Sequence, residues 1–190
     1  MAHASQAAVA IWCETAHELM VAERPEGYRS ALPWLRRAAR AGEPWAAYHI
    51  GLMFDHGLGV GRNVAKAIVW YSAVAAGGYD SAQLNLGIIY VNLPGARRDL
   101  VCATALYRSA ARQGNRNAMH NLGLYYELGR GVRRSRRLAV HWYSKAAARG
   151  DRQARSRMKA LASRGGRTTG CTGARAAGLI DSAGGLARAW

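Results

Sequence analysis

The sequence predicts an all-α protein, a right-handed superhelix or solenoid built from helix-turn-helix repeats of 36 residues. Two observations lead to this fold class. Glycine and alanine return at a constant spacing of 36 residues, and apolar residues within each period are spaced as on two amphipathic helices. A single helix pair cannot bury both of its faces, so neighbouring pairs must stack into a curved array.

Small and aromatic residues carry the repeat in a constant register. The small residues recur at Gly42, Gly78, Gly114 and Gly150, at Ala46, Ala82, Ala118 and Ala154, and at Gly51, Gly87 and Gly123. The aromatic residues recur at Trp34, Trp70 and Trp142, with Leu106 in the equivalent position of the middle unit, and at Tyr71, Tyr107 and Tyr143. Because the small residues lack bulk, two helix backbones can approach closely there, and the large rings fill the spaces between layers.

The helices follow from this register. We expect helix pairs at about 44–77, 80–113 and 116–149, preceded by helices at 6–21 and 30–41 and followed by one from 151 to about 162. Asn63, Asp99 and Ser135 have side chains that can cap the second helix of each pair. We expect Asp80, Asn115 and Asp151 to cap the first helices in the same way. Gly78, Gly114 and Gly150 follow the second helices, where a left-handed glycine commonly ends a helix.

The expected domain organisation has three parts. The first is a degenerate N-terminal helix or cap, and the second is the solenoid with partial units at both ends. The third is a tail rich in Gly, Arg and Ala that we expect to be disordered. The boundaries are 1–29, 30–162 and 163–190, with full units at about 44–79, 80–115 and 116–151.

The net charge of +16 is concentrated in the second half of the chain. Residues 1–95 hold seven Lys and Arg against seven Asp and Glu, whereas residues 96–190 hold twenty against four. The isolated Cys13, Cys102 and Cys171 suggest neither a disulfide framework nor a zinc site. No apolar run is long enough to span a bilayer, and no recognisable signal peptide opens the chain. We therefore expect a cytoplasmic protein, with the periplasm or secretion by another route left open.

The units 46–78, 82–114 and 118–150 closely resemble the Sel-one-like repeat, a relative of the tetratricopeptide repeat. The string AMHNLGLYYELGRGVRRSRRLAVHWYSKAAARG carries the alanine, Leu-Gly, Gly-x-Gly-Val, Trp-Tyr and Ala-Ala positions of that repeat. One departure is Leu93, which stands where the other units have Gly57 and Gly129, so its loop should turn differently. The resemblance covers about 30–162 and implies protein binding, as in bacterial and eukaryotic adaptors, without naming the partner.

The resemblance also implies a binding surface, because the first helix of each tetratricopeptide unit lines the concave groove. The residues expected there, called the groove set below, are Tyr48, His49, Leu52, Asp55, Asn85, Ile88, Asn92, His120, Asn121, Leu124 and Glu127. An Asn amide facing a groove can pair with the backbone of an extended peptide. The alternative for Asn85 and Asn121 is that each bonds a neighbouring helix of its own fold.

A second candidate surface is an arginine-rich patch formed by Arg133, Arg134, Arg136, Arg137, Arg152 and Arg155. It could attract nucleic acid, an anionic surface or an acidic protein, or simply be a solvated basic face. His49 and His56 lie seven residues apart, but no Cys or carboxylate cluster accompanies them, so we expect no metal site.

Signatures of catalysis are missing from the sequence. It has no Gly-x-Ser-x-Gly elbow, no phosphate-binding glycine loop with lysine and no zinc-protease histidine pair. Cysteine-rich relatives that have been linked to β-lactam hydrolysis carry paired cysteines in each repeat, which this chain lacks. We therefore expect a non-enzymatic scaffold that needs no cofactor and holds a peptide or helix of another protein. The alternative is nucleic-acid or anionic-surface binding through the arginine-rich half.

Overall fold

A computed structural model describes residues 4–21, 24–94 and 99–165 of the chain. Within these ranges the backbone forms α-helices joined by turns, and no strand is present. The helices are α1 (Gln6–Val21), α2 (Pro25–Arg40), α3 (Pro44–His56), α4 (Val64–Ala76), α5 (Asp80–Asn92), α6 (Leu100–Arg112), α7 (Arg116–Leu128), α8 (Arg136–Ala148) and α9 (Arg152–Gly165). The predicted all-α repeat superhelix is confirmed.

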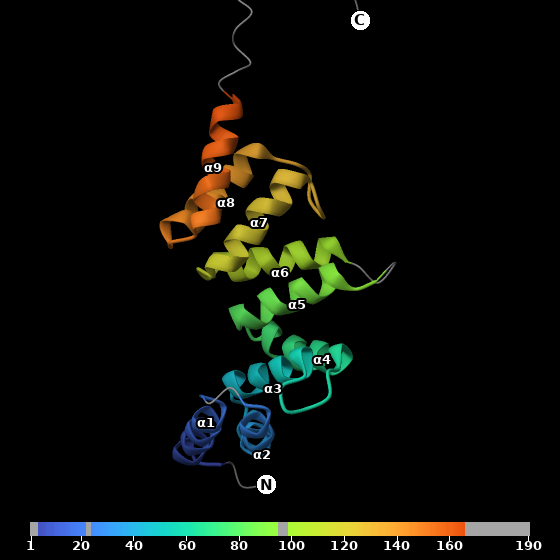
Figure 1. The fold of residues 1–190 in the computed structure, drawn as a ribbon, viewed down its shortest axis with the longest axis vertical. Coiled ribbons are helices and arrows are strands. Elements are labelled where there is room, and N and C mark those ends of the chain that lie inside the picture. The colour runs from blue at the N-terminus through green and yellow to red at the C-terminus, as the bar shows by residue number, and fades with distance from the viewer. Residues whose placement is uncertain (1–3, 22–23, 95–98, 166–190) are drawn as a thin grey trace, which may run out of the picture.

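The helices follow one another along an elongated stack, from α1 at one end to α9 at the other (Figure 1). Each helix packs against the next one in the sequence. The pairs α3 with α4, α5 with α6 and α7 with α8 form the three full units. Contacts between neighbours in sequence therefore build the array, as expected for a repeat protein.

The caps of the second helices are those that the sequence predicts. Asn63 accepts a hydrogen bond from the N–H of Lys66 at 2.9 Å, and Asp99 accepts one from Cys102 at 2.8 Å. Ser135 caps α8 through the N–H of Leu138 at 3.3 Å. Each side chain satisfies a backbone donor that the first helical turn leaves unpaired.

The caps of the first helices agree with the prediction at two of three positions. Asn115 and Asp151 cap α7 and α9. The expectation for Asp80 is wrong, because Tyr79 occupies the cap position of α5 and has no side-chain cap bond. Asp80 is instead the first residue of α5, where its Oδ2 accepts a hydrogen bond from Nδ2 of Asn115 at 2.8 Å. A carboxylate in the first turn is still stabilised by the positive end of the helix dipole.

Two ends differ from the expected helix boundaries. Helix α2 begins at Pro25 rather than at Ser30, because proline suits a first helical turn whose N–H groups have no helical acceptor. Helix α9 continues to Gly165, three residues beyond the expected end. The expected disorder of the tail concerns residues that, from 166 onward, lie outside those described.

Glycines with a left-handed backbone separate the units. Gly78, Gly114 and Gly150 have φ angles of 93°, 102° and 87°, which an L side chain adopts only with strain. Within units, α3 and α7 end on left-handed Gly57 and Gly129, whereas Leu93 after α5 is extended with φ −61°. The predicted difference is therefore confirmed at Leu93, while residues 95–98 of this loop lie outside those described.

The buried core forms two clusters along the stack. One gathers residues of α1 to α5, and the other gathers residues of α6 to α9 together with Leu84 of α5. The repeated alanines Ala46, Ala82, Ala118 and Ala154 are fully buried. Small side chains at these positions let the helices approach closely enough for the array to exclude water.

Candidate functional site

The groove set lies on the first helices of the three full units, α3, α5 and α7. None of its members is fully buried, and Ile88 and Asn92 are exposed. Ile88 is 38% exposed, so part of its aliphatic side chain is accessible to a ligand. The set therefore presents partly accessible polar and apolar groups along one row of helices.

Three members of the groove set line a common surface pocket of about 610 Å³. Asp55 comes from α3, and Ile88 and Asn92 come from α5. Val64, Ile89, Leu93 and Pro94 add apolar walls, and His56 and Arg62 add polar edges. The pocket thus combines an apolar interior with hydrogen-bonding groups at its rim, as small peptide-binding pockets do.

Asn85 and Asn121 occupy equivalent repeat positions but have different surroundings. Nδ2 of Asn85 lies 3.3 Å from the hydroxyls of both Tyr48 and Tyr71, so this amide bonds the preceding unit. At Asn121 the residue equivalent to Tyr48 is Leu84, which offers no hydroxyl. Among the described residues nothing bonds the half-buried Asn121 side chain. The alternative of bonding within the fold therefore holds for Asn85 and not for Asn121.

A row of buried tyrosines lies beneath the groove set and was not predicted as a polar feature. Burial raises the pKa of Tyr71, Tyr107 and Tyr143 well above the ordinary value, so their hydroxyls stay protonated and can donate. The hydroxyl of Tyr143 donates to Oε2 of Glu127 at 2.7 Å. The recurrence of tyrosine every 36 residues is the sequence signal for this row, although the spacing by itself predicts only that the rings fill spaces between layers.

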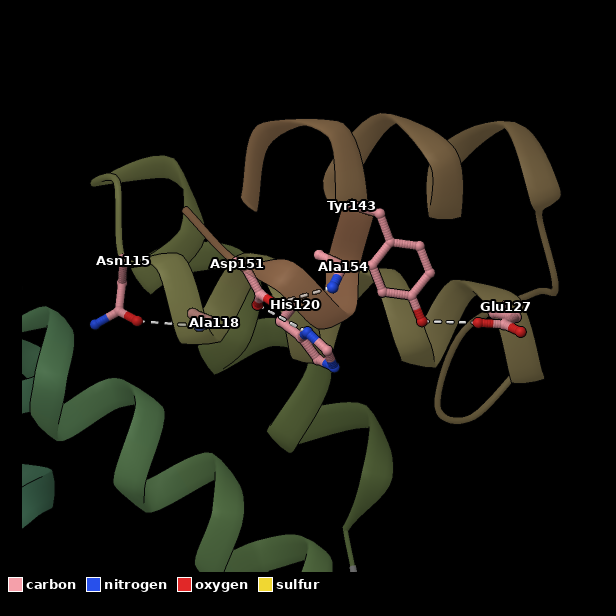
Figure 2. Close-up of polar contacts among 7 residues, drawn as sticks. All are labelled: Asn115, Ala118, His120, Glu127, Tyr143, Asp151 and Ala154. Carbon is pink, nitrogen blue, oxygen red and sulfur yellow. Dashed lines mark hydrogen bonds and ion pairs between the residues drawn. The ribbon is translucent and has the colours of Figure 1, made fainter. Parts of the chain in front are cut away.

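Two further members of the groove set, His120 and Glu127, connect α7 to the last helix. Figure 2 shows the contact of His120 with Asp151 and that of Glu127 with Tyr143. Nδ1 of His120 lies 2.8 Å from Oδ2 of Asp151, whose other oxygen caps α9 through the N–H of Ala154 at 2.9 Å. Oε2 of Glu127 also accepts a hydrogen bond from Nη1 of Arg157 at 3.2 Å and forms an ion pair with it. These contacts make His120 and Glu127 structural groups of the α7–α9 interface as well as candidate groove residues.

Hydrogen bonds also lower the pKa of the Asp151 carboxyl. Burial is the largest single influence and opposes ionisation, but the N–H groups of Ala154 and Gln153 and the His120 ring together outweigh it. Asp151 therefore remains a carboxylate under mildly acidic conditions. Its negative charge stabilises α9, because it lies at the positive, N-terminal end of that helix.

The N-terminal end of the groove set is aromatic. The ring of His49 lies 4.3 Å from that of Trp45 and 5.4 Å from that of Tyr48, measured between centroids. Burial and the nearby charge of His17 lower the pKa of His49 to about 4, so the ring is neutral at pH 7. Among the residues that the structure describes, no three His, Cys, Asp or Glu side chains come together as metal ligands.

The arginine-rich patch contains both engaged and unengaged guanidinium groups. Arg134 donates Nε to the carbonyl of Glu127 at 3.0 Å, as Arg62 does to the carbonyl of Asp55 at 2.8 Å. Weaker contacts join Arg136 to the carbonyl of Ala162 and Arg155 to that of Ala147. Arg133, Arg137 and Arg152 are exposed. Part of the predicted patch thus closes helix ends, and part remains available to a partner.

None of the described helices is long and apolar enough to cross a membrane. Cys13 and Cys102 carry free thiols, and Cys171 lies outside the described residues.

Comparison with known proteins shows that four segments of this chain match one repeat family. The model of the family described as the Sel1 repeat matches residues 24–43, 46–79, 80–115 and 116–151. No curated protein matches the chain.

Among solved structures, a protective antigen of uropathogenic Escherichia coli that displays an SLR fold is 32% identical, with a TM-score of 0.76. The alignment covers 83% of this chain and 34% of the antigen. A Sel1 repeat protein from Oxalobacter formigenes is also 32% identical, with a TM-score of 0.73, over 80% of this chain and 61% of that one. Cysteine-rich protein B of Helicobacter pylori, at 23% identity and a TM-score of 0.51, shares the fold over 64% of this chain and 92% of its own. This chain thus spans about a third and three fifths of the first two proteins.

Proposed function

This chain belongs to the Sel1 repeat family, whose members generally serve as protein-interaction scaffolds, and we propose that it binds a peptide or helix of a partner protein along the groove set. The fold of this family is typically non-enzymatic. The observation that supports the proposal most strongly is the pocket where Asp55, Ile88 and Asn92 come together from two neighbouring units.

The chemistry of the pocket fits one apolar side chain of a bound segment. Ile88 and Ile89 supply apolar contact, and burying such a surface stabilises a complex by about 25 cal/mol per Å². Asn92 can pair both its donor and its acceptor with an extended backbone at the rim. One unit further along the array, the amide of Asn121 is the second group that we assign to the backbone of the partner.

The experiment starts from peptides selected from a random display library against the purified full chain. The dissociation constant of a selected peptide is then measured by calorimetry for the wild type and for Ile88→Ser and Asn121→Ala. We expect each substitution to weaken binding about fivefold, since each removes roughly 1 kcal/mol of contact. Asn121 is the better choice than Asn85, because replacing Asn85 would also disturb Tyr48 and Tyr71.

Val69→Ser is the matched control for Ile88→Ser. Val69 is a large aliphatic residue on the second helix α4 and is 68% exposed, so its replacement should leave peptide affinity unchanged. Circular dichroism checks that all variants keep their helices. If Val69→Ser weakens binding as much as Ile88→Ser while Asn121→Ala has no effect, the groove set is not the binding surface.

A further inference from the structure

A second surface pocket, of about 540 Å³, lies apart from the groove set. Helix α6 contributes Arg108, the end of α7 contributes Tyr126, and the following loop contributes Val132, Arg133 and Arg134. No residue that lines it belongs to the groove set. Any ligand of this pocket would therefore occupy a different surface from the peptide proposed above.

The floor of this pocket is apolar and firmly placed. Tyr126 and Val132 are half-buried and pack against the second core cluster, and Leu138 of α8 adds a further aliphatic wall. Because Tyr126 and Val132 pack against the core, both side chains are held in place without a ligand. A small apolar side chain that enters the pocket would lose water contact without requiring the protein to rearrange.

Two of the arginines around the pocket are already held in position. Nη2 of Arg108 donates to the hydroxyl of Tyr126 at 3.1 Å, and Nε of Arg134 donates to the carbonyl of Glu127 at 3.0 Å. A guanidinium carries five N–H donors, so each group keeps further donors for a ligand. The entropy of ordering these long side chains is therefore spent on folding rather than on binding. Arg133 between them is exposed.

The positive charge around the pocket has no acidic counterpart in the surrounding segment. From Asp99, just before α6, to Ser163 the sequence has fourteen Lys and Arg but only three carboxylates, Asp99, Glu127 and Asp151. Asp99 caps α6 through the N–H of Cys102. Glu127 is engaged by Tyr143 and Arg157, and Asp151 by His120. Within the described residues, none of these three carboxylates forms an ion pair with an arginine of the pocket. The pocket therefore favours an anion supplied by another molecule.

We propose that this pocket docks an acidic segment of a partner protein, with a carboxylate on Arg133 and Arg134 and a neighbouring apolar side chain on Val132 and Leu138. The apolar floor favours a polypeptide over a nucleic acid, whose phosphates need no such floor. The only aromatic ring in the lining, that of Tyr126, packs against the core and is not a free platform on which a base could stack.

The test measures how tightly the full chain binds a short fluorescein-labelled peptide of alternating glutamate and leucine. Fluorescence anisotropy of the labelled peptide reports the binding. Two matched peptides replace either all glutamates by glutamine or all leucines by serine. We expect both changes to weaken binding, because the proposal requires the charge and the apolar side chain together. Arg133→Gln should weaken binding of the glutamate–leucine peptide about fivefold.

Arg116→Gln is the control, because it removes the same charge from an exposed position on α7 that does not line the pocket. It should leave the affinity within about twofold of the wild type. Equal losses for Arg116→Gln and Arg133→Gln, or equal binding of the glutamine peptide, would overturn the proposal. A single-stranded oligothymidylate that binds more tightly than the peptide and displaces it would assign the surface to nucleic acid instead.

Discussion

Gly123 of α7 and Tyr143 of α8 fit together so closely that a Cβ atom on Gly123 would lie 2.7 Å from Cδ1 of Tyr143. The same relationship joins Gly51 to Tyr71 and Gly87 to Tyr107 in the other full units. At the start of the array Thr15 takes the glycine position, and fully buried Leu35 takes the tyrosine position. The glycine is therefore required where a tyrosine ring lies across the first helix.

Gly123→Ala should destabilise the protein by about 1–2 kcal/mol. Alanine is the better helix former, but its methyl group would overlap the buried Tyr143 ring, and overpacking a core costs about 1–3 kcal/mol. Urea denaturation measures the change in the free energy of unfolding. Lys159→Ala is the control, since exposed Lys159 occupies the same repeat position on α9 and should change stability by less than about 0.5 kcal/mol. Equal effects of the two substitutions would refute the packing explanation.

Tyr143→Phe should loosen the docking of the last helix. The substitution removes the hydrogen bond to Glu127, which also holds Arg157 of α9, and should cost about 1 kcal/mol. Hydrogen exchange should then speed up in the amides of α9 more than in those of α3. Tyr28→Phe is the comparison, because no described residue bonds the Tyr28 hydroxyl. Unchanged exchange in α9 would show that this contact does not hold the helix.

Stability should fall as the pH is lowered from 7 towards 4 because of His49. The folded ring titrates near 4, whereas an unfolded histidine titrates near about 6.5, so the unfolded state binds more protons between these values. After allowance for the water that reaches this half-buried ring, we expect a loss of about 1 kcal/mol between pH 7 and pH 5. Urea denaturation at both pH values measures it.

His49→Gln should flatten this pH dependence, while the same change at exposed His56 should leave it as in the wild type. A His49→Gln variant with the full wild-type loss between pH 7 and pH 5 would assign the acid sensitivity to other groups.

Asp151 should contribute stability at pH 7 that disappears in acid. Its pKa is lower when folded, so its contribution is present above the unfolded value of about 4 and is lost as the pH falls through the folded pKa. Asp151→Asn keeps a capping oxygen but removes the charge, and should cost about 0.5–1 kcal/mol at pH 7. Thermal denaturation at pH 7 and pH 3 should show the variant approaching the wild type at the lower pH. A constant difference at both pH values would contradict the electrostatic origin.

The helices and most of their caps could be predicted from the sequence because each depends on nearby residues. Asn63, Asp99 and Ser135 act within their own first turns, and the spacing of 36 residues carries the assignment from unit to unit. Asp80 was misassigned because Tyr79, and not Asp80, is 36 residues before Asn115. Proline at the start of α2 was an available signal for its earlier beginning.

The candidate site was less predictable because it depends on contacts between units. Asn85 and Asn121 occupy equivalent positions in the sequence, yet among the described residues only Asn85 forms hydrogen bonds with tyrosine hydroxyls. In the unit before Asn121, Leu84 replaces Tyr48, and Tyr107, the equivalent of Tyr71, has a side-chain hydrogen bond with Tyr125 instead. The sequence also did not reveal that Arg134 bonds the carbonyl of Glu127, since that contact requires the folded loop.

If the first helices form the binding surface, a bound peptide must protect them and not the second helices. Hydrogen exchange measured by mass spectrometry, with and without a library-selected peptide at saturation, decides between these two surfaces. We predict that the peptide protects segments of α5 and α7 around Ile88 and Asn121 and leaves the exposed face of α4 around Val69 unchanged. Protection confined to the second helices, or to the loop around Arg133, would contradict it.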